Sequence, residues 1–145
     1  MQLWFNEKHS SSINFNIKIK EHLFSGKSDF QKIDILQTVE LGKILVLDGI
    51  LMLTEKDEFI YHEMMTHIPM AVLPDAEKIL VIGAGDGGTV SQLVKYKSIK
   101  QIDVIEIDEM VVEKCREYFP KLTKGFSDER VTIKYEDGLK YVRNI

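Results

Sequence analysis

The strongest constraint on the fold is a glycine-rich segment, Gly83-Ala84-Gly85-Asp86-Gly87-Gly88, which directly follows a short apolar run. A strand, a glycine-rich turn and a helix in this order are typical of the first unit of a doubly wound α/β domain. The sequence downstream repeats the alternation of strand and helix patterns. We expect a buried strand at residues 78–82, further strands at 101–107 and 131–135, and helices at 89–97, 109–119 and 138–145.

The first 57 residues have a different pattern. Apolar and polar residues alternate from residue 13 to 20, as in a half-buried strand. Further strands are expected at residues 30–39, 43–47 and 50–53, the last two joined by Asp48-Gly49, a pair that suits a tight hairpin turn. From Glu58 the period becomes helical and stops near Pro69 or Pro74.

These patterns predict an α/β protein of two domains. Residues 1–57 form a small N-terminal antiparallel β-sheet domain, and residues 58–145 form the first part of a Rossmann-like, methyltransferase-type doubly wound domain. Three parallel strands make an incomplete sheet, because such sheets normally have five or more strands and helices on both faces. We therefore expect the chain to be the N-terminal portion of a longer protein.

Composition excludes several classes of function. The 145 residues carry 19 Lys and Arg against 23 Asp and Glu, a net charge of −4, which argues against a general affinity for nucleic acid. The single cysteine, Cys115, excludes an internal disulfide and a cysteine-based metal site. His62 and His67 are five residues apart, not the four of a zinc protease helix, so no metal is expected. Without a long apolar run or a leader peptide, the chain is expected in the cytoplasm, away from the membrane.

The spacing of the glycines alone does not identify a ligand. Gly83, Gly85 and Gly88 fit a dinucleotide fingerprint, whereas Gly83, Gly85 and Gly87 fit a methyltransferase-type loop. Asp86 would repel a pyrophosphate at the start of the helix, so a ligand with a sulfonium or ammonium group fits better. A tight turn that binds nothing remains the alternative.

Acidic residues follow the next two expected strands. Glu106 ends the second strand, where a carboxylate can accept both hydroxyls of a ribose. Asp137-Gly138 follows the third strand and can either meet an adenine edge or cap a helix. For Asp108 we favour a role in capping a helix over ligand contact. Because carboxylates concentrate cations in a cleft, the pattern favours an amine substrate.

Several linked motifs together resemble the polyamine aminopropyltransferases, the family of spermidine synthase. The resemblance spans nearly the whole chain, and Ala84 stands where many members have glycine. It rests on the glycine loop with its internal Asp86 and on the segments Leu47-Asp48-Gly49, Thr54-Glu55-Lys56-Asp57-Glu58-Phe59-Ile60-Tyr61-His62-Glu63, His67-Ile68-Pro69, Val104-Ile105-Glu106-Ile107-Asp108 and Tyr135-Glu136-Asp137-Gly138.

The resemblance implies transfer of a 3-aminopropyl group from decarboxylated S-adenosylmethionine to putrescine, giving spermidine and methylthioadenosine. It implies no cofactor, since the nucleoside is a co-substrate, and a homodimer or homotetramer. The implied nucleoside-binding residues are Gln31, Gly83, Gly85, Glu106, Asp137 and Gly138, and the implied polyamine and aminopropyl residues are Tyr61, His62 and Asp86.

The catalytic residue that the family uses as a base has no counterpart in this sequence. The aspartate segment that supplies it follows a fourth strand, so we expect the base beyond Ile145. Two alternatives stay open: an S-adenosylmethionine-dependent methyltransferase, and a noncatalytic fragment that binds nucleoside or only assembles.

Overall fold

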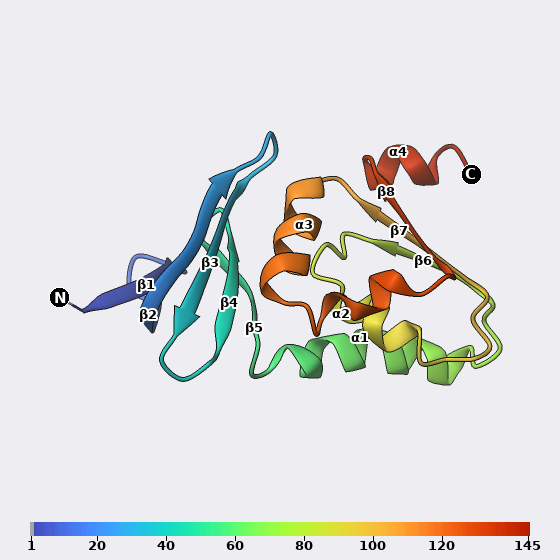
Figure 1. The fold of residues 1–145 in the computed structure, drawn as a ribbon, viewed down its shortest axis with the longest axis horizontal. Coiled ribbons are helices and arrows are strands. Elements are labelled where there is room, and N and C mark those ends of the chain that lie inside the picture. Colours follow the sequence, from blue (N-terminus) through green and yellow to red (C-terminus); the bar gives the residue numbers. More distant parts are fainter. Residues whose placement is uncertain (1) are drawn as a thin grey trace. The chain divides into compact units, whose positions relative to one another are not determined.

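Figure 1 shows a computed structural model of the protein, which describes residues 2–145. The chain divides into two compact units, residues 1–58 and 59–145. The N-terminal unit is an antiparallel sheet with its strands in sequence order, which confirms the predicted sheet. The strands are β1 (Leu3–Lys8), β2 (Asn14–Lys27), β3 (Lys32–Thr38), β4 (Lys43–Leu47) and β5 (Ile50–Thr54).

The sheet is strongly curled. Although β1 and β5 are its outermost strands, the Glu7 carboxylate on β1 accepts a hydrogen bond from the Leu51 N–H on β5 at 2.7 Å. The curl comes partly from β2, whose pairing with β3 shifts between Ile19 and Glu21 and again between His22 and Phe24. Each shift is a β-bulge, and a bulge bends its strand.

Two sequence expectations for this unit need adjustment. The strand expected at residues 13–20 continues to Lys27, because the bulges let one long strand pair with β1 and then with β3. The strand expected at 30–39 begins only at Lys32, since the Ser28 hydroxyl accepts the N–H groups of Phe30 and Gln31 and forms a turn there. The Asp48-Gly49 hairpin is confirmed, with φ angles of 50° and 82° that suit a type I′ turn.

The C-terminal unit contains a parallel sheet in the order β6-β7-β8, as the doubly wound pattern predicts. The strands are β6 (Lys78–Ile82), β7 (Gln101–Glu106) and β8 (Val131–Tyr135). The helices are α1 (Glu58–Val72), α2 (Gly88–Leu93), α3 (Glu109–Tyr118) and α4 (Gly138–Val142), with a 3₁₀ helix, η1, at Thr123–Ser127. None of the helices within residues 2–145 is long and apolar enough to cross a lipid bilayer.

Helices α1, α2 and α3 and the 3₁₀ helix η1 cover one face of this sheet. Met70 of α1, Val90 of α2, Val112 of α3 and Phe126 of η1 share a single core with Val104 of β7. On β6, Leu80 and Ile82 point away from that core and remain 39% and 52% exposed, so the expectation of a fully buried strand is wrong for this strand. The reason is that burial on both faces requires helices on both sides of a parallel sheet.

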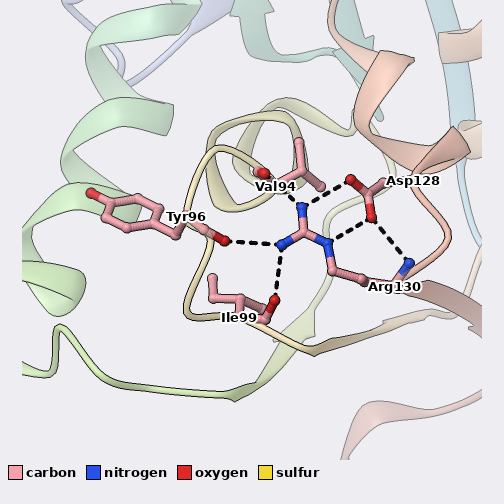
Figure 2. A network of polar contacts seen from close by, with 5 residues as sticks. All are labelled: Val94, Tyr96, Ile99, Asp128 and Arg130. Carbon is pink, nitrogen blue, oxygen red and sulfur yellow. Dashed lines mark hydrogen bonds and ion pairs between the residues drawn. The ribbon is translucent and has the colours of Figure 1, made fainter.

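Helix α2 ends at Leu93, four residues before the expected end at residue 97. Figure 2 shows why: the Arg130 guanidinium lies beyond the end of the helix and donates hydrogen bonds to the carbonyl oxygens of Val94, Tyr96 and Ile99, at 2.6 to 2.9 Å. It also binds both carboxylate oxygens of Asp128, at 2.8 and 2.9 Å. All five guanidinium N–H groups are thereby used, and the chain is held in a turn instead of continuing as helix.

Candidate functional site at the carboxyl edge of the parallel sheet

The predicted site elements meet at one edge of the sheet. Because β6, β7 and β8 are parallel and paired in register, their carboxyl ends lie side by side. The glycine loop follows β6, Glu106 is the last residue of β7, and Asp137-Gly138 follows β8. A Cβ atom on Gly138 would lie only 2.4 Å from Cγ2 of Ile82, so the start of α4 packs directly on the end of β6.

The glycine loop needs its glycines for different reasons. Gly83 and Gly87 have φ angles of 72° and 79°, in the left-handed region that favours glycine. At Gly85 a Cβ atom would come within 2.8 Å of Val111 on α3 and 3.1 Å of the Glu106 carboxylate. At Gly83 it would meet nothing within 4 Å, so a ligand can approach the loop from that side.

The Glu106 side chain connects the end of β7 to the glycine loop through a hydrogen bond. Glu106 is 8% exposed, and its carboxylate accepts the Gly85 N–H at 3.0 Å through Oε2 and the Asp108 N–H at 3.1 Å through Oε1. A carboxylate oxygen has two lone pairs, so each oxygen retains capacity for a further donor such as a ribose hydroxyl. The ribose role of Glu106 stays a prediction. Its hold on Gly85 was not foreseen, because no local sequence pattern links the two residues.

Asp86 and His62 form a contact at the start of α2. Oδ1 of Asp86 accepts the Gly88 N–H at 2.7 Å and lies 3.2 Å from Nε2 of His62. The His62 ring packs on Gly88, where a Cβ atom would lie 2.2 Å from the ring. His62 is only 2% exposed, whereas the Asp86 side chain is 25% exposed. The family resemblance implies one channel for both residues, which stays a prediction; in the structure a buried His62 contacts the partly exposed Asp86.

The acidic character of this site affects its surroundings. Burial raises the pKa of the Cys115 thiol on α3, and the negative charges of Asp86 and Glu106 raise it further. The thiol is fully buried, as the sequence suggests for an apolar residue of α3. Two carboxylates therefore act on one region of the protein interior, and their field favours a cationic ligand at the sheet edge.

Two further aspartates cap helices. Asp108 is buried at the start of α3 and accepts the Met110 N–H at 3.1 Å, which confirms the capping interpretation. Asp137 is exposed and accepts the Lys140 N–H at 3.0 Å at the start of α4. A capping aspartate keeps a second oxygen for a ligand, so the nucleoside role of Asp137 stays a prediction.

The remaining predicted residues make none of the hydrogen bonds of the glycine loop described above. Tyr61 is exposed on α1, with its ring edge-to-face against His62 at 5.4 Å. Gln31 belongs to the N-terminal unit, in the turn between β2 and β3. His67 lies 2.7 Å from the Tyr96 hydroxyl, a structural contact. Residues 2–145 contain no group of three or more side chains that could hold a metal ion.

The contact between α2 and η1 was not predicted from the sequence. The Ser91 hydroxyl accepts the Gly125 N–H of η1 at 2.9 Å and donates to the Leu122 carbonyl oxygen. A Cβ atom on Gly125 would lie 2.7 Å from the Ser91 backbone, so η1 and α2 are in close contact. The isolated Gly125 was the only available signal, since a glycine outside a turn motif often marks such an approach.

Two family models match the chain, one for each unit. The model of the spermine/spermidine synthase domain matches residues 58–145. The model of the spermidine synthase tetramerisation domain matches residues 3–55.

Individual proteins match over the whole chain. A polyamine aminopropyltransferase from Clostridium perfringens strain SM101 is 52% identical over 145 residues, all of this chain and 51% of that protein. One from Clostridium botulinum strain Alaska E43 is 54% identical over 144 residues, 99% of this chain and 51% of that protein. The chain therefore spans about half the length of the curated relatives it matches.

Solved structures match equally well. The crystal structure of spermidine synthase from Thermotoga maritima has a TM-score of 0.95 and 41% identity, covering 99% of this chain and 50% of that one. A spermidine synthase in complex with the transition state analogue AdoDATO gives the same score, identity and coverage.

Proposed function

Because the chain belongs to the spermine/spermidine synthase family, we propose that the full-length protein is a spermidine synthase. It transfers the 3-aminopropyl group of decarboxylated S-adenosylmethionine to putrescine. A base takes a proton from an ammonium group of putrescine, and the neutral nitrogen attacks the terminal carbon of the aminopropyl group as the bond between that carbon and the sulfonium sulfur breaks. Methylthioadenosine leaves with the electron pair of that bond, and the new secondary amine of spermidine is formed in its protonated state.

The observation that carries this proposal is the pair of carboxylates at the glycine loop. Asp86 lies within the loop, and Glu106, at the end of β7, accepts the Gly85 N–H. Two carboxylates at this place favour a sulfonium and an ammonium and disfavour a pyrophosphate. Both proposed substrates are cations, so the charge of the site matches them.

The two substrates occupy different parts of this edge. Glu106, Gly83, Gly85, Asp137 and Gly138 hold the nucleoside, with Glu106 accepting from the ribose hydroxyls and Gly83 leaving space for the ligand. The assignment of Gln31, in the N-terminal unit, to the nucleoside rests on the family resemblance alone. Asp86 receives the cationic aminopropyl or diamine end, and Tyr61 and His62 belong to the same part of the site.

The residues 1–145 mainly bind and orient the substrates. No residue among them is assigned as the general base, and we place that base outside the sequence. Decarboxylated S-adenosylmethionine is consumed as a co-substrate, so no separate cofactor is required. Holding the amine in line with the carbon–sulfur bond supplies much of the acceleration, because the sulfonium is already a good leaving group.

The N-terminal sheet provides the assembly surface. It exposes large apolar side chains, among them Leu3, Trp4, Ile13, Phe15 and Val39. Exposed apolar patches of this kind mark protein–protein contacts. We propose a homodimer or homotetramer assembled through this sheet, located in the cytoplasm, and light scattering of the full-length protein measures its mass directly.

The test of the function uses the full-length protein with putrescine and decarboxylated S-adenosylmethionine. We expect methylthioadenosine and spermidine in equal amounts by chromatography. We also expect calorimetry to show tighter binding of the decarboxylated nucleoside than of S-adenosylmethionine, whose extra carboxylate meets the acidic loop. Tighter binding of the carboxylated form would overturn the proposal in favour of methyl transfer, which family membership does not favour.

A further inference from the structure

We infer that Ser91 is a positioning residue for nucleoside binding, because its hydroxyl holds η1 against the Gly87 end of the glycine loop. Ser91 is 6% exposed and belongs to none of the predicted substrate contacts. The inference rests on the proposed function and deepens it, by assigning part of the nucleoside affinity to a contact on the buried side of α2.

The glycine loop has little rigidity of its own. Gly83 and Gly87 have positive φ angles, and glycine loses more conformational freedom on folding than any other residue. Glycines also have no side chain to pack on a neighbour, so the loop keeps its shape through contacts that other residues make. The Glu106 carboxylate supplies one such contact, at the Gly85 N–H.

The 3₁₀ helix η1 supplies a second contact, at Gly87. A Cβ atom on Gly87 would lie 3.0 Å from Cα of Thr123 and 3.0 Å from the Phe126 ring, so η1 lies directly against this glycine. Phe126 is also part of the core of the C-terminal unit. Thr123 donates a hydrogen bond at 3.3 Å to the carbonyl oxygen of Phe119, which follows α3. The position of Gly87 therefore depends on η1, and η1 is fixed to the core and to α3.

The Ser91 side chain keeps η1 in this place. Ser91 lies one turn after Gly87, and its N–H donates to the Gly87 carbonyl oxygen at 2.9 Å. Its hydroxyl accepts the Gly125 N–H at 2.9 Å and donates to the Leu122 carbonyl oxygen. Both partners are buried, and a buried backbone group that loses its partner is costly. Loss of the hydroxyl should therefore loosen η1 from the first turn of α2.

A loosened loop should weaken nucleoside binding without slowing the chemical step. The apparent Kd of a ligand rises as the fraction of molecules with a formed binding site falls. A bound nucleoside restores the same loop, so the rate at saturation with both substrates should not change. The inference therefore predicts a change in nucleoside affinity with kcat preserved.

Two substitutions in the full-length protein test the hydroxyl. Ser91→Ala removes it, and Ser91→Cys fills its place with a group that forms only weak hydrogen bonds. We expect both to raise the Kd for methylthioadenosine about fivefold to tenfold by calorimetry, the scale on which a residue without ligand contact changes an affinity. KM for decarboxylated S-adenosylmethionine should rise by the same factor. At saturating nucleoside, kcat and KM for putrescine should stay within about twofold.

Either of two results in Ser91→Ala would overturn the inference. One is an unchanged Kd for methylthioadenosine. The other is a fall in kcat with an unchanged KM for the nucleoside, which would place Ser91 in the chemical step.

A double-mutant cycle decides whether Ser91 acts through η1. Phe126→Leu removes the ring that contacts Gly87 and leaves Ser91 intact, so this variant should also raise the Kd for methylthioadenosine. If both residues act through η1, adding Ser91→Ala to Phe126→Leu raises the Kd by no more than about twofold. Effects that multiply in full would refute the inference. If Ser91→Ala does not fold by circular dichroism, Phe126→Leu carries the test, and an unchanged Kd in it is the refuting result.

Thr38→Val is the matched control, in the N-terminal unit. Thr38 is 2% exposed, and its hydroxyl accepts the Leu41 N–H at 2.8 Å and donates to the Gly42 carbonyl oxygen at 2.7 Å, the same pattern as at Ser91. The control should lower the melting temperature by a similar amount and leave the Kd for methylthioadenosine unchanged. An equal rise of the Kd in both variants would mean that lost stability alone weakens binding, and the inference would be wrong.

Failure of the proposed function has a different signature. A full-length protein that binds methylthioadenosine but forms no spermidine would refute the proposed function, and the Kd values of Ser91→Ala and Thr38→Val would still decide this inference. A full-length protein that binds no methylthioadenosine would overturn both.

Discussion

Removal of the Arg130 side chain should loosen the segment that follows α2. Arg130→Met keeps a similar volume but loses every hydrogen-bond donor of the guanidinium. In the native protein these donors bind three carbonyl oxygens and the Asp128 carboxylate (Figure 2). The variant therefore leaves Asp128 without its cation and three carbonyl groups without their donor.

The magnitude follows from two contributions. Hydrogen bonds from Arg130 lower the pKa of Asp128 from its usual 3.8 to about 2. One pKa unit corresponds to about 1.4 kcal/mol, so this shift corresponds to ~2.5 kcal/mol of interaction between Arg130 and Asp128. Solvent screens a partly exposed pair, so we count its contribution to the free energy of unfolding as roughly 1 kcal/mol. Three carbonyl bonds at about 0.5–1 kcal/mol each add roughly 2 kcal/mol, since water replaces part of each bond. We expect a total loss of about 3 kcal/mol.

Amide hydrogen exchange measures this loss locally. The Val94 and Tyr96 amides donate to Val90 and Leu93, so their exchange should accelerate about 100-fold in Arg130→Met, the equivalent of ~3 kcal/mol. Lys97→Gln, which removes an exposed cation from the same segment, is the control and should leave exchange unchanged. Peptides from β2 serve as an internal reference. Unaltered exchange at Val94 and Tyr96 would refute the reasoning.

The same pair predicts a dependence on pH. Because the folded-state pKa of Asp128 is lowered, its contribution is complete above about pH 4 to 5 and is lost as pH falls toward 2. The difference in stability between the native protein and Arg130→Met should therefore be constant near neutral pH. It should shrink as acid protonates Asp128, as measured by thermal unfolding at a series of pH values.

Three further substitutions test the sheet edge. Glu106→Gln should weaken methylthioadenosine binding at least several-fold by calorimetry, because a charge-assisted hydrogen bond contributes about 1.5–3 kcal/mol; an unchanged Kd would mean that Glu106 only holds the loop. Gly88→Ala should lower the melting temperature sharply, since the new Cβ atom would lie 2.2 Å from the His62 ring. Gly83→Ala should lower the free energy of unfolding less, by about 1–2 kcal/mol, because only its left-handed backbone opposes a side chain. An equal loss of stability in both variants would contradict this explanation.

The sequence was sufficient where local patterns decide the structure. The bounds of β6, β8 and the Asp48-Gly49 hairpin follow from apolar runs and turn residues, and they agree with the structure. The end of α2 did not follow, because it depends on Arg130, 36 residues beyond Val94 in the chain. A contact at that separation leaves no periodic signal near the helix.

The site shows the same limit. The order of loop, Glu106 and Asp137 along the chain predicted which residues share the sheet edge, because parallel strands end together. The depth of His62 did not follow from the sequence. It depends on how closely α1 approaches Gly88, and the spacing of buried residues on α1 is compatible with several depths.

The two bulges of β2 restrict which changes in chain length the N-terminal sheet can accept. Lys20 and Leu23 are the extra residues at the two register shifts, the first next to the point where β2 passes from pairing with β1 to pairing with β3, and the second within the part that pairs with β3. Residues directly opposite each other in a sheet share a face, so deletion of either extra residue leaves a regular ladder in which Ile17 and Ile19 keep the core face. Deletion of one residue elsewhere in β2 would turn part of the strand's side chains to the other face. The two bulges are therefore the positions at which this strand should tolerate the loss of a single residue.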